Sequence, residues 1–191
     1  MTHVSILGNG SMGSAITALV TKSGNSVEVL GTNDKDTPIT GDVVILAVPH
    51  GALATVVATR GPSLAGKVVV DITNPLNFET FDSLVVPSDS SSAAELAAAL
   101  PDSHVLKAFN TNFASTLASG GVGDNPTTVL VAGDNGDAKA ELIGIITAAG
   151  LKASDAGSLR RARELEAIGF LQLTLAATEK IGWTGGFAVV A

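Results

Sequence analysis

Short apolar runs recur along the chain, and most lead through a polar or glycine-containing segment into a stretch that suits a helix. Near-continuous runs of this kind are typical of parallel strands that are buried on both faces. We expect strands at residues 4–7, 26–30, 43–48, 67–72, 105–109, 127–132 and 151–154. We expect helices at 11–23, 52–59, 93–100, 138–149 and 158–177. The alternation predicts an α/β fold with a Rossmann-like, doubly wound, mostly parallel sheet.

The chain between the second and third strands is too short for the usual crossover. Residues 31–42 leave no room for both a helix and another strand, but an extended chain of this length reaches about 40 Å. We therefore expect a shortened second crossover, with the second strand at a sheet edge. The dinucleotide-binding domain is expected at 1–157, followed by a C-terminal helical extension and tail at 158–191.

Two further local expectations concern loops and caps. Residues 116–123 contain three glycines and are expected to form a loop. Ser92 precedes an alanine-rich segment and is expected to cap its helix, which Pro101 should stop.

A Gly-x-Gly-x-x-Gly motif directly follows the first strand and opens the first helix. Its residues are Gly8, Asn9, Gly10, Ser11, Met12 and Gly13. In dinucleotide-binding proteins the first glycine permits the tight turn, the second admits the pyrophosphate, and the third allows the helix to pack closely. The amide groups at the start of the helix then face the phosphates. The motif alone is weak evidence, but its position between a strand and a helix favours dinucleotide binding over a purely structural turn.

The tip of the second strand favours NADP(H) over NAD(H). NAD-binding folds usually carry an acidic residue there, which binds the ribose 2′-hydroxyl. Here Gly31 leaves room for a 2′-phosphate, with Thr32 and Asn33 as neutral donors and Lys35 as a positive charge.

The carboxyl ends of the strands supply the remaining candidates, because ligands of open α/β sheets bind beyond these ends. Ala47, Val48, Pro49 and Asn74 are expected near the cofactor. The substrate pocket is expected to contain His50, Pro75, Asn110 and Trp183. Trp183 could equally be an aromatic plug on the core.

Composition excludes several classes of function. A net charge of −7 argues against nucleic-acid binding, and the absence of cysteine removes disulfides, thiolate nucleophiles and cysteine-based metal sites. No apolar stretch reaches the ~18 residues needed to span a membrane, and no signal segment is evident, so we expect a cytoplasmic protein. The C-terminal helix is polar at its start and then apolar on nearly all sides up to residue 177. This apolar part needs cover, which predicts a homodimer.

No catalytic side chain or metal site is evident. His3 and His104 are expected to be structural or exposed, whereas His50 stands at the active edge. Asp71 lies inside a buried strand, where it is expected to cap backbone groups rather than to catalyse. Glu164 and Glu166 are two positions apart and are expected to be solvated.

Four motifs together resemble the NADP oxidoreductase, coenzyme F-420-dependent, family. They lie at Ile6–Gly13, Ala47–Pro49, Val70–Leu76 and Lys107–Thr111, and the similarity extends to the turn at 155–157. The family includes deazaflavin:NADP reductases and the related NADPH domain of membrane ferric reductases. The resemblance implies direct hydride transfer between nicotinamide and a flavin-like ring, with no side chain acting as acid or base.

The resemblance also implies positions for the ligands. Gly8 to Gly13 would hold the pyrophosphate, Thr32 and Asn33 the 2′-phosphate, and Val48, Pro49 and Asn74 would surround the nicotinamide. Asn110 falls where deazaflavin reductases tend to carry a histidine beside the acceptor ring. The acceptor could therefore be a deazaflavin, a free flavin, a ferric chelate or a small carbonyl or imine compound. A non-catalytic NADP-binding redox sensor is a further alternative.

Overall fold

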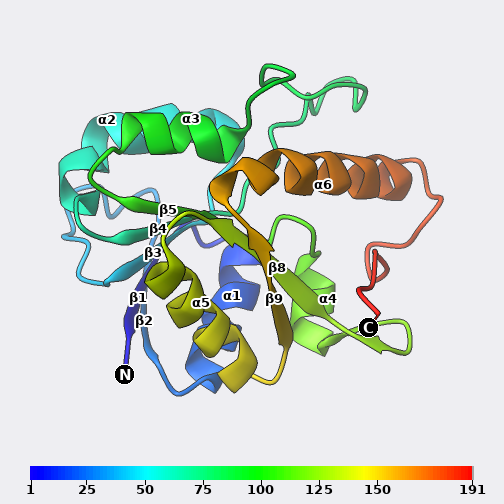
Figure 1. Ribbon diagram of the computed structural model, residues 1–191, viewed down its shortest axis with the longest axis horizontal. Helices are drawn as coiled ribbons and strands as arrows, with labels where there is room; N and C mark the ends of the chain where they lie inside the picture. Colours follow the sequence, from blue (N-terminus) through cyan, green and yellow to red (C-terminus); the bar gives the residue numbers. More distant parts are fainter. Residues whose placement is uncertain (191) are drawn as a thin grey trace.

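Seven strands form one sheet in the order β2-β1-β3-β4-β5-β8-β9 in the computed structural model, which describes residues 1–190 (Figure 1). The strands are β1 His3–Leu7, β2 Ser26–Leu30, β3 Val43–Leu46, β4 Val68–Asp71, β5 His104–Lys107, β8 Thr128–Gly133 and β9 Lys152–Gly157. Neighbouring strands are parallel except β5 and β8, which are antiparallel. The Rossmann-like, mostly parallel sheet expected from the sequence is confirmed.

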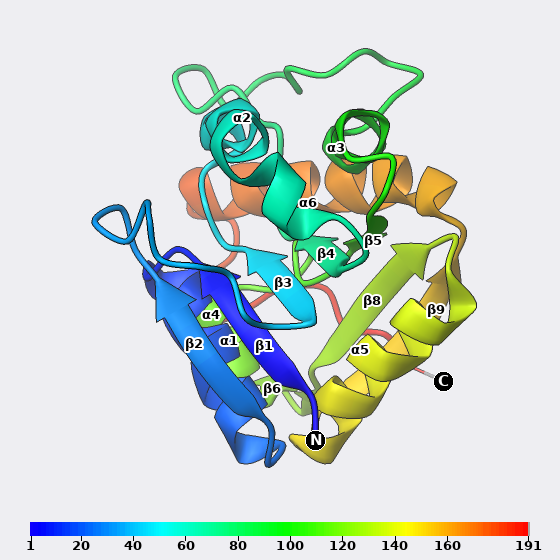
Figure 2. The ribbon, with the colours of Figure 1, turned by 90° about the vertical axis from the view of Figure 1, so that its left-hand side faces the viewer.

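Helices cover both faces of this sheet. Helices α2 Leu53–Leu64, α3 Ser92–Ala99 and α6 Ala162–Ala177 lie on one side, and α1 Ser11–Lys22, α4 Ala114–Ser119 and α5 Gly136–Ala148 lie on the other (Figures 1 and 2). Successive strand side chains point to opposite faces, so Ile6 belongs to the apolar core under α1 and α5. Leu7 belongs to a second core under α2 and α3. The strands are apolar in both directions because both faces are covered.

Residues 31–42 connect β2 to β3 without a helix or strand, as expected, and β2 lies at the sheet edge. The segment is held by side chains instead of regular hydrogen bonds. Arg60 on α2 donates to the backbone carbonyls of Asp34 and Thr37, and Lys67 donates to that of Gly41. Ile39 is buried in the core under α2.

Two local expectations were wrong. The segment expected to be a loop at 116–123 contains most of α4 and a small hairpin of β6 Gly121–Val122 and β7 Asn125–Pro126. Gly120 ends α4 in the left-handed conformation, with φ of 75°. The cap of α3 is Ser91, whose side chain accepts from the amide of Ala94, because the helix begins one residue earlier than expected. Pro101 does follow the helix.

The C-terminal part packs on the same side of the sheet as α2 and α3 (Figure 2). Helix α6 contacts α3 and β8, and residues 178–190 follow it as an irregular tail. The division at residue 157 remains a prediction. Within the described residues, no helix is both long and apolar enough to cross a membrane.

Candidate functional site

The glycine-rich turn between β1 and α1 combines two structural glycines with one that faces open space. A Cβ atom at Gly8, where φ is +115°, would lie 2.1 Å from the carbonyl oxygen of Ala47. A Cβ atom at Gly13 would lie 2.1 Å from the carbonyl oxygen of Gly8. At Gly10 the added atom would meet nothing within 4 Å. Gly8 and Gly13 therefore permit the turn and the close packing of α1, whereas Gly10 keeps a surface clear.

Helix α1 begins beside that clear surface. Its N-cap is Gly10, which has no side chain to accept from the first amides of the helix. Unsatisfied amides and the helix dipole at such an end attract anions, so the site fits a pyrophosphate. Cavities lie on both sides of the turn: Asn9 lines the smaller one, and Ser11 and Met12 line the larger one.

The smaller cavity, of about 270 Å³, lies at the tip of β2. It is lined by Gly31, Thr32 and Lys35 from the shortened crossover and by Arg60 from α2. Asn33 is exposed and lies outside the lining. The two cationic side chains suit a phosphate group. Arg60 was missed in the sequence because only the fold brings α2 next to this turn.

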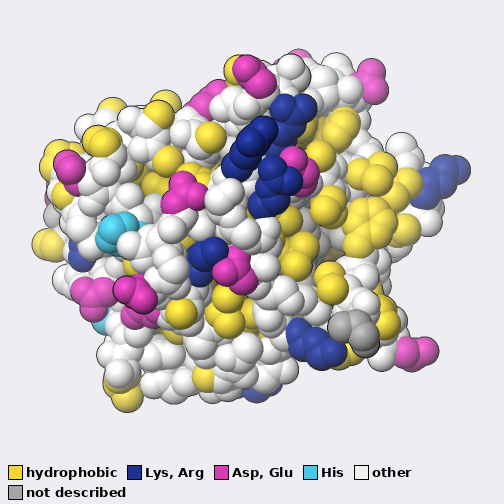
Figure 3. Space-filling model, viewed as in Figure 1, with side chains coloured by type: hydrophobic (Ala, Val, Ile, Leu, Met, Phe, Trp, Pro, Cys, Tyr) yellow, Lys and Arg dark blue, Asp and Glu magenta, His cyan; other side chains and the backbone are white. Residues whose placement is uncertain are grey.

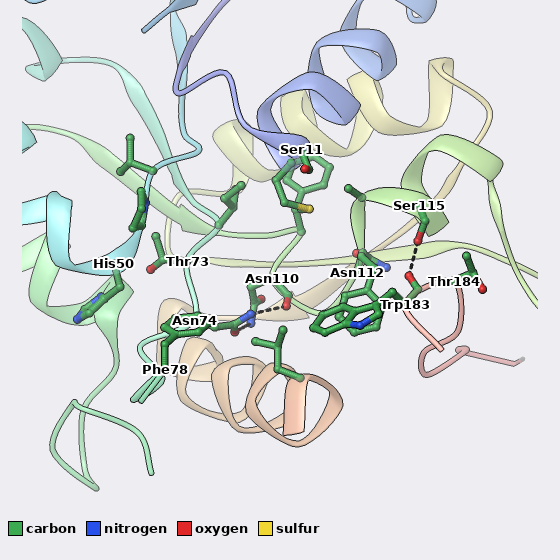
Figure 4. A pocket seen from close by; sticks show the side chains of 18 residues that line it. Ser11, His50, Thr73, Asn74, Phe78, Asn110, Asn112, Ser115, Trp183 and Thr184 are labelled. Atoms are coloured by element: carbon green, nitrogen blue, oxygen red, sulfur yellow. Dashed lines mark hydrogen bonds between the residues drawn. The ribbon is translucent and has the colours of Figure 1, made fainter. Parts of the chain in front are cut away.

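The larger cavity, of about 640 Å³, lies beyond the carboxyl ends of β1, β3, β4 and β5 (Figure 4). None of its described lining residues is Asp, Glu, Lys or Arg. Of the residues expected near the nicotinamide or the substrate, the lining includes Val48, Pro49, His50, Asn74, Asn110 and Trp183. Val48 also lines the smaller cavity, so it forms a ridge between the two. Ala47 faces Gly8 through its carbonyl, and Pro75 is buried outside the lining.

Two asparagines hold the floor of the larger cavity together. Asn74 Nδ2 donates to the carbonyl of Asn110 at 2.9 Å, and Asn110 Nδ2 donates to Asn74 Oδ1 at 2.9 Å (Figure 4). Asn110 Nδ2 also donates to the carbonyl of Leu165 at 2.8 Å, so the pair ties the strand ends to α6. Phe109 precedes this pair in a left-handed conformation, with φ of 63°. Strain of this kind concentrates at functional sites.

Trp183 lies at the wall of the larger cavity. Its ring packs against Phe113 with a centroid separation of 5.1 Å, and 54% of the residue is exposed. Ser115 donates to the carbonyl of Trp183 and anchors the tail (Figure 4). The tryptophan therefore flanks the cavity and does not plug the core.

A buried charge cluster lies behind the cavity. Lys107 Nζ is 2.8 Å from Asp71 Oδ2 and 2.8 Å from Glu166 Oε1, and all three side chains are at most 1% exposed. Glu166 also accepts from the amides of Ser92 and Ala93, at the start of α3. Burial raises the pKa of Glu166, and the charge of Lys107 partly offsets this effect. The expectation that Glu166 is solvated was wrong, because its side of α6 faces Lys107.

Known proteins are similar to this chain in sequence and in fold. No family model matches the chain. The F420-dependent NADP reductase of Methanocaldococcus jannaschii is 31% identical over 173 residues, which cover 87% of this chain and 76% of that protein. The chain belongs to the F420-dependent NADP reductase family.

The chain is also similar to a metalloreductase and to a protein of known crystal structure. The metalloreductase STEAP3 of Rattus norvegicus is 31% identical over 180 residues, which cover 86% of this chain but only 36% of that protein. The crystal structure of an Arthrobacter sp. FB24 protein, assigned as an F420-dependent NADP reductase, superposes with a TM-score of 0.85. The match covers 100% of both chains at 21% identity and shows the shared fold.

Family membership confirms the resemblance seen in the motifs, together with the expected NADP-dependent oxidoreductase class and NADP(H) as cofactor. The individual site residues remain predictions. Lys107 and Thr73 were not expected to belong to the site. Both lie inside motifs of the family resemblance, but the sequence does not indicate that Lys107 contacts Asp71 or that Thr73 contacts Ser92. Asp71 caps the backbone as expected, since its Oδ1 accepts from the amide of Thr73 at 2.8 Å.

Proposed function

We propose that this protein transfers hydride between NADP(H) and a planar, flavin-like or deazaflavin acceptor. The observation that carries the proposal is the cavity of about 640 Å³ beside the glycine-rich turn, whose described lining holds aromatic side chains and no Asp, Glu, Lys or Arg. Its aromatic walls, which include Phe109, Phe113 and Trp183, suit a flat ring that stacks on apolar surfaces. A lining without Asp, Glu, Lys or Arg suits direct transfer of the hydride itself, a step that requires positioning and no acid or base.

The cofactor is proposed to bridge both cavities across the glycine-rich turn. Gly10 and the first amides of α1 would hold the pyrophosphate, and Thr32, Asn33 and Lys35 would face the 2′-phosphate. The nicotinamide would lie in the larger cavity beside Val48, Pro49 and Asn74. Bound NADPH supplies the hydride, and the chain orients it and excludes water around it. The names of the relatives support NADP(H) in this role.

The acceptor is proposed to occupy the remainder of the larger cavity. His50 and Asn110 line its polar parts, Trp183 flanks it, and Pro75 is buried next to Asn74 in the chain. The reductase of M. jannaschii is named for F420, which places a deazaflavin first among the candidates. Free flavins, ferric chelates and small imines are the alternatives.

The experiment is a set of anaerobic reactions in which NADPH or NADH is mixed with F420, FMN, a ferric chelate or a cyclic imine. Loss of the reduced-nicotinamide absorbance measures turnover, and we expect it with NADPH and F420 or FMN. Turnover with the cyclic imine and with no other acceptor would contradict a flavin-like acceptor and indicate an imine reductase. Tight binding of NADPH with no turnover of any acceptor would favour the sensor alternative.

We also propose that the protein forms a homodimer through α6. Ile168 is 36% exposed and Leu171 is 51% exposed on this helix. Figure 3 shows apolar side chains gathered over α6 and the segment after it, beside a group of basic side chains. A contiguous apolar surface on a small domain is typical of a protein interface.

A further inference from the structure

A chain of three polar side chains runs from the larger cavity into a second cavity. Thr73 lines the larger cavity, and its Oγ1 lies 3.1 Å from the Oγ of Ser92. The same Ser92 oxygen lies 3.1 Å from Nδ1 of His50. His50 and Ser92 also line a groove of about 440 Å³ between α2 and α3. Figure 4 shows His50 and Thr73 on the opposite side of the larger cavity from Trp183.

The chemistry of these groups suits proton movement. A hydroxyl group donates and accepts hydrogen bonds at the same time, so two hydroxyls in series can pass a proton on. Thr73 is 5% exposed and Ser92 is 1% exposed, so bulk water does not bypass them. Among the described lining residues of the larger cavity, His50 alone carries a titratable side chain, and it also contacts the groove. Histidine is the side chain that ordinarily changes its charge between pH 5 and 8.

The buried charge cluster holds the two hydroxyl residues in place. Asp71 accepts from the amide of Thr73 at 2.8 Å, and Lys107 donates to the carbonyl of Thr73 at 2.6 Å. Glu166 accepts from the amide of Ser92 at 3.0 Å. Burying three ionisable side chains costs free energy, because charged groups lose their hydration. In this protein their hydrogen bonds hold two facing hydroxyl residues in place. Asp71, Lys107 and Glu166 are therefore positioning residues.

We propose that His50, Ser92 and Thr73 form a proton relay that serves the hydride acceptor. The proposal rests on the proposed function, because reduction of a flavin-like ring consumes one hydride and one proton. The hydride carries both electrons from C4 of NADPH, which leaves as NADP⁺. A ring nitrogen of the acceptor takes the proton of the Thr73 hydroxyl, and Thr73 takes the proton of Ser92. Ser92 takes the Nδ1 proton of the His50 imidazolium, which regains one from solvent in the groove.

The charged groups around His50 are few. Glu95 of α3 lines the groove with His50, and Asp71, Lys107 and Glu166 lie buried behind Thr73 and Ser92. In the acceptor-reducing direction, kcat should fall at high pH, where solvent no longer resupplies the proton that the relay delivers.

The first test uses the free protein. Nitrogen-15 NMR of the His50 ring should show a hydrogen-bonded Nδ1 whose shift changes in Ser92→Ala. The corresponding spectrum of His104, which is exposed at the start of β5, should stay the same in that variant. An unchanged His50 spectrum in Ser92→Ala would contradict the hydrogen-bonded chain.

The second test uses turnover of NADPH with the acceptor found above. His50→Gln, Ser92→Ala and Thr73→Val should each lower kcat about 10-fold to 100-fold, the range of a lost proton-transfer group. Thr73→Ser keeps the hydroxyl group and should retain kcat. The control His104→Gln should match the unmodified protein. NADPH affinity and thermal unfolding, measured on each variant, report on binding and folding separately.

Isotope effects and pH profiles separate a relay from a structural role. With slow proton delivery, Ser92→Ala should show a larger solvent deuterium isotope effect and a smaller effect from deuterated NADPH. The fall of kcat at high pH should disappear in His50→Gln. Unchanged isotope effects, or an unchanged pH profile in His50→Gln, would overturn the relay. If the unmodified protein turned over no acceptor, the proposed function would fail first, and the NMR result would still stand.

Discussion

Single positions in the glycine-rich turn have separable roles. Gly8 and Gly13 are required by the chain itself, since an added Cβ atom at either position would lie 2.1 Å from a carbonyl oxygen. No protein contact requires a glycine at position 10, because an added Cβ atom there would meet nothing within 4 Å. Its φ of −71° also allows any side chain.

Gly10→Val should therefore weaken NADPH binding strongly and leave the fold intact. We expect NADPH affinity to fall about 100-fold or more, because the valine would fill the position of the pyrophosphate, and 100-fold corresponds to about 2.8 kcal/mol. The free energy of unfolding should change by less than about 1 kcal/mol. Titration calorimetry and denaturant unfolding measure the two quantities. Gly13→Ala is the contrast, with an expected loss of about 1–3 kcal/mol of stability. Unimpaired binding of NADPH by Gly10→Val would contradict the proposal that the pyrophosphate lies beside Gly10.

At the scale of elements, α6 is the helix that closes the site. It contributes Glu166 to the buried charge cluster and the Leu165 carbonyl to Asn110. It also approaches Asn74 closely at Gly169, where a Cβ atom would lie 2.2 Å from Asn74 Oδ1. Helix α6 can therefore lie this close to Asn74 only because residue 169 is a glycine.

Gly169→Ala should push α6 away from Asn74. We expect a loss of about 1–3 kcal/mol in the free energy of unfolding, because the Asn74 amide that the added methyl group would meet is held by hydrogen bonds to Asn110, and moving it would break them. The control is Gly144→Ala at an exposed position of α5, where an added Cβ atom would meet nothing within 4 Å. That change should stabilise the protein by about 0.5–1 kcal/mol, because alanine favours a helix. Denaturant unfolding measures both. Equal effects of the two substitutions would show that Gly169 is not a packing contact.

The far edge of the sheet makes a pH-dependent contact between α5 and β9. A hydrogen bond from Lys139 lowers the pKa of Asp155, and the amide of Gly157 adds to this effect. A lowered pKa stabilises the fold above the unfolded value, about 3.9, and the stabilisation is lost as pH falls through the folded value. Asp155→Asn should thus cost at most about 1 kcal/mol at neutral pH, because the Asp155 side chain is half exposed. Unfolding measured from neutral to strongly acidic pH should show the difference vanish in acid; a constant difference would contradict the assignment.

For the whole molecule, the arrangement of charge and apolar surface suits self-association. The larger cavity lies beyond the carboxyl ends of the central strands and is lined on one side by Trp183 of the C-terminal tail. Apolar side chains of α6 and the tail face outwards (Figure 3). Phe187 is 44% exposed and Val189 is 42% exposed in that tail. Covering this surface with a second copy would remove apolar area from water.

Light scattering should accordingly give twice the chain mass of 19.1 kDa at micromolar concentration. Leu171→Glu should return the mass of a single chain, because a charge buried in an apolar interface is unfavourable. Val85→Glu, on the exposed irregular segment before α3, is the matched control and should stay dimeric. A single-chain mass for the unmodified protein would reject the dimer.

Local sequence patterns were sufficient for the main elements and failed where tertiary contacts decide. The glycines at 120–123 mark the end of α4 and a turn, but α4 is only six residues long and carries too little periodicity to be recognised. Glu166 resembles a solvated residue because its neighbours on α6 are charged. Its burial follows from Lys107, which is distant in the chain and adjacent in space.

The sequence by itself determined the strands, the glycine-rich turn, the family and the cofactor class, because these depend on local periodicity and on backbone freedom at single glycines. Only the tertiary structure decided which side chains meet: Arg60 with the tip of β2, Glu166 with Lys107, and His50 with Ser92 and Thr73. Such contacts join segments far apart in the chain, and their energies depend on distance and burial, which no local pattern contains.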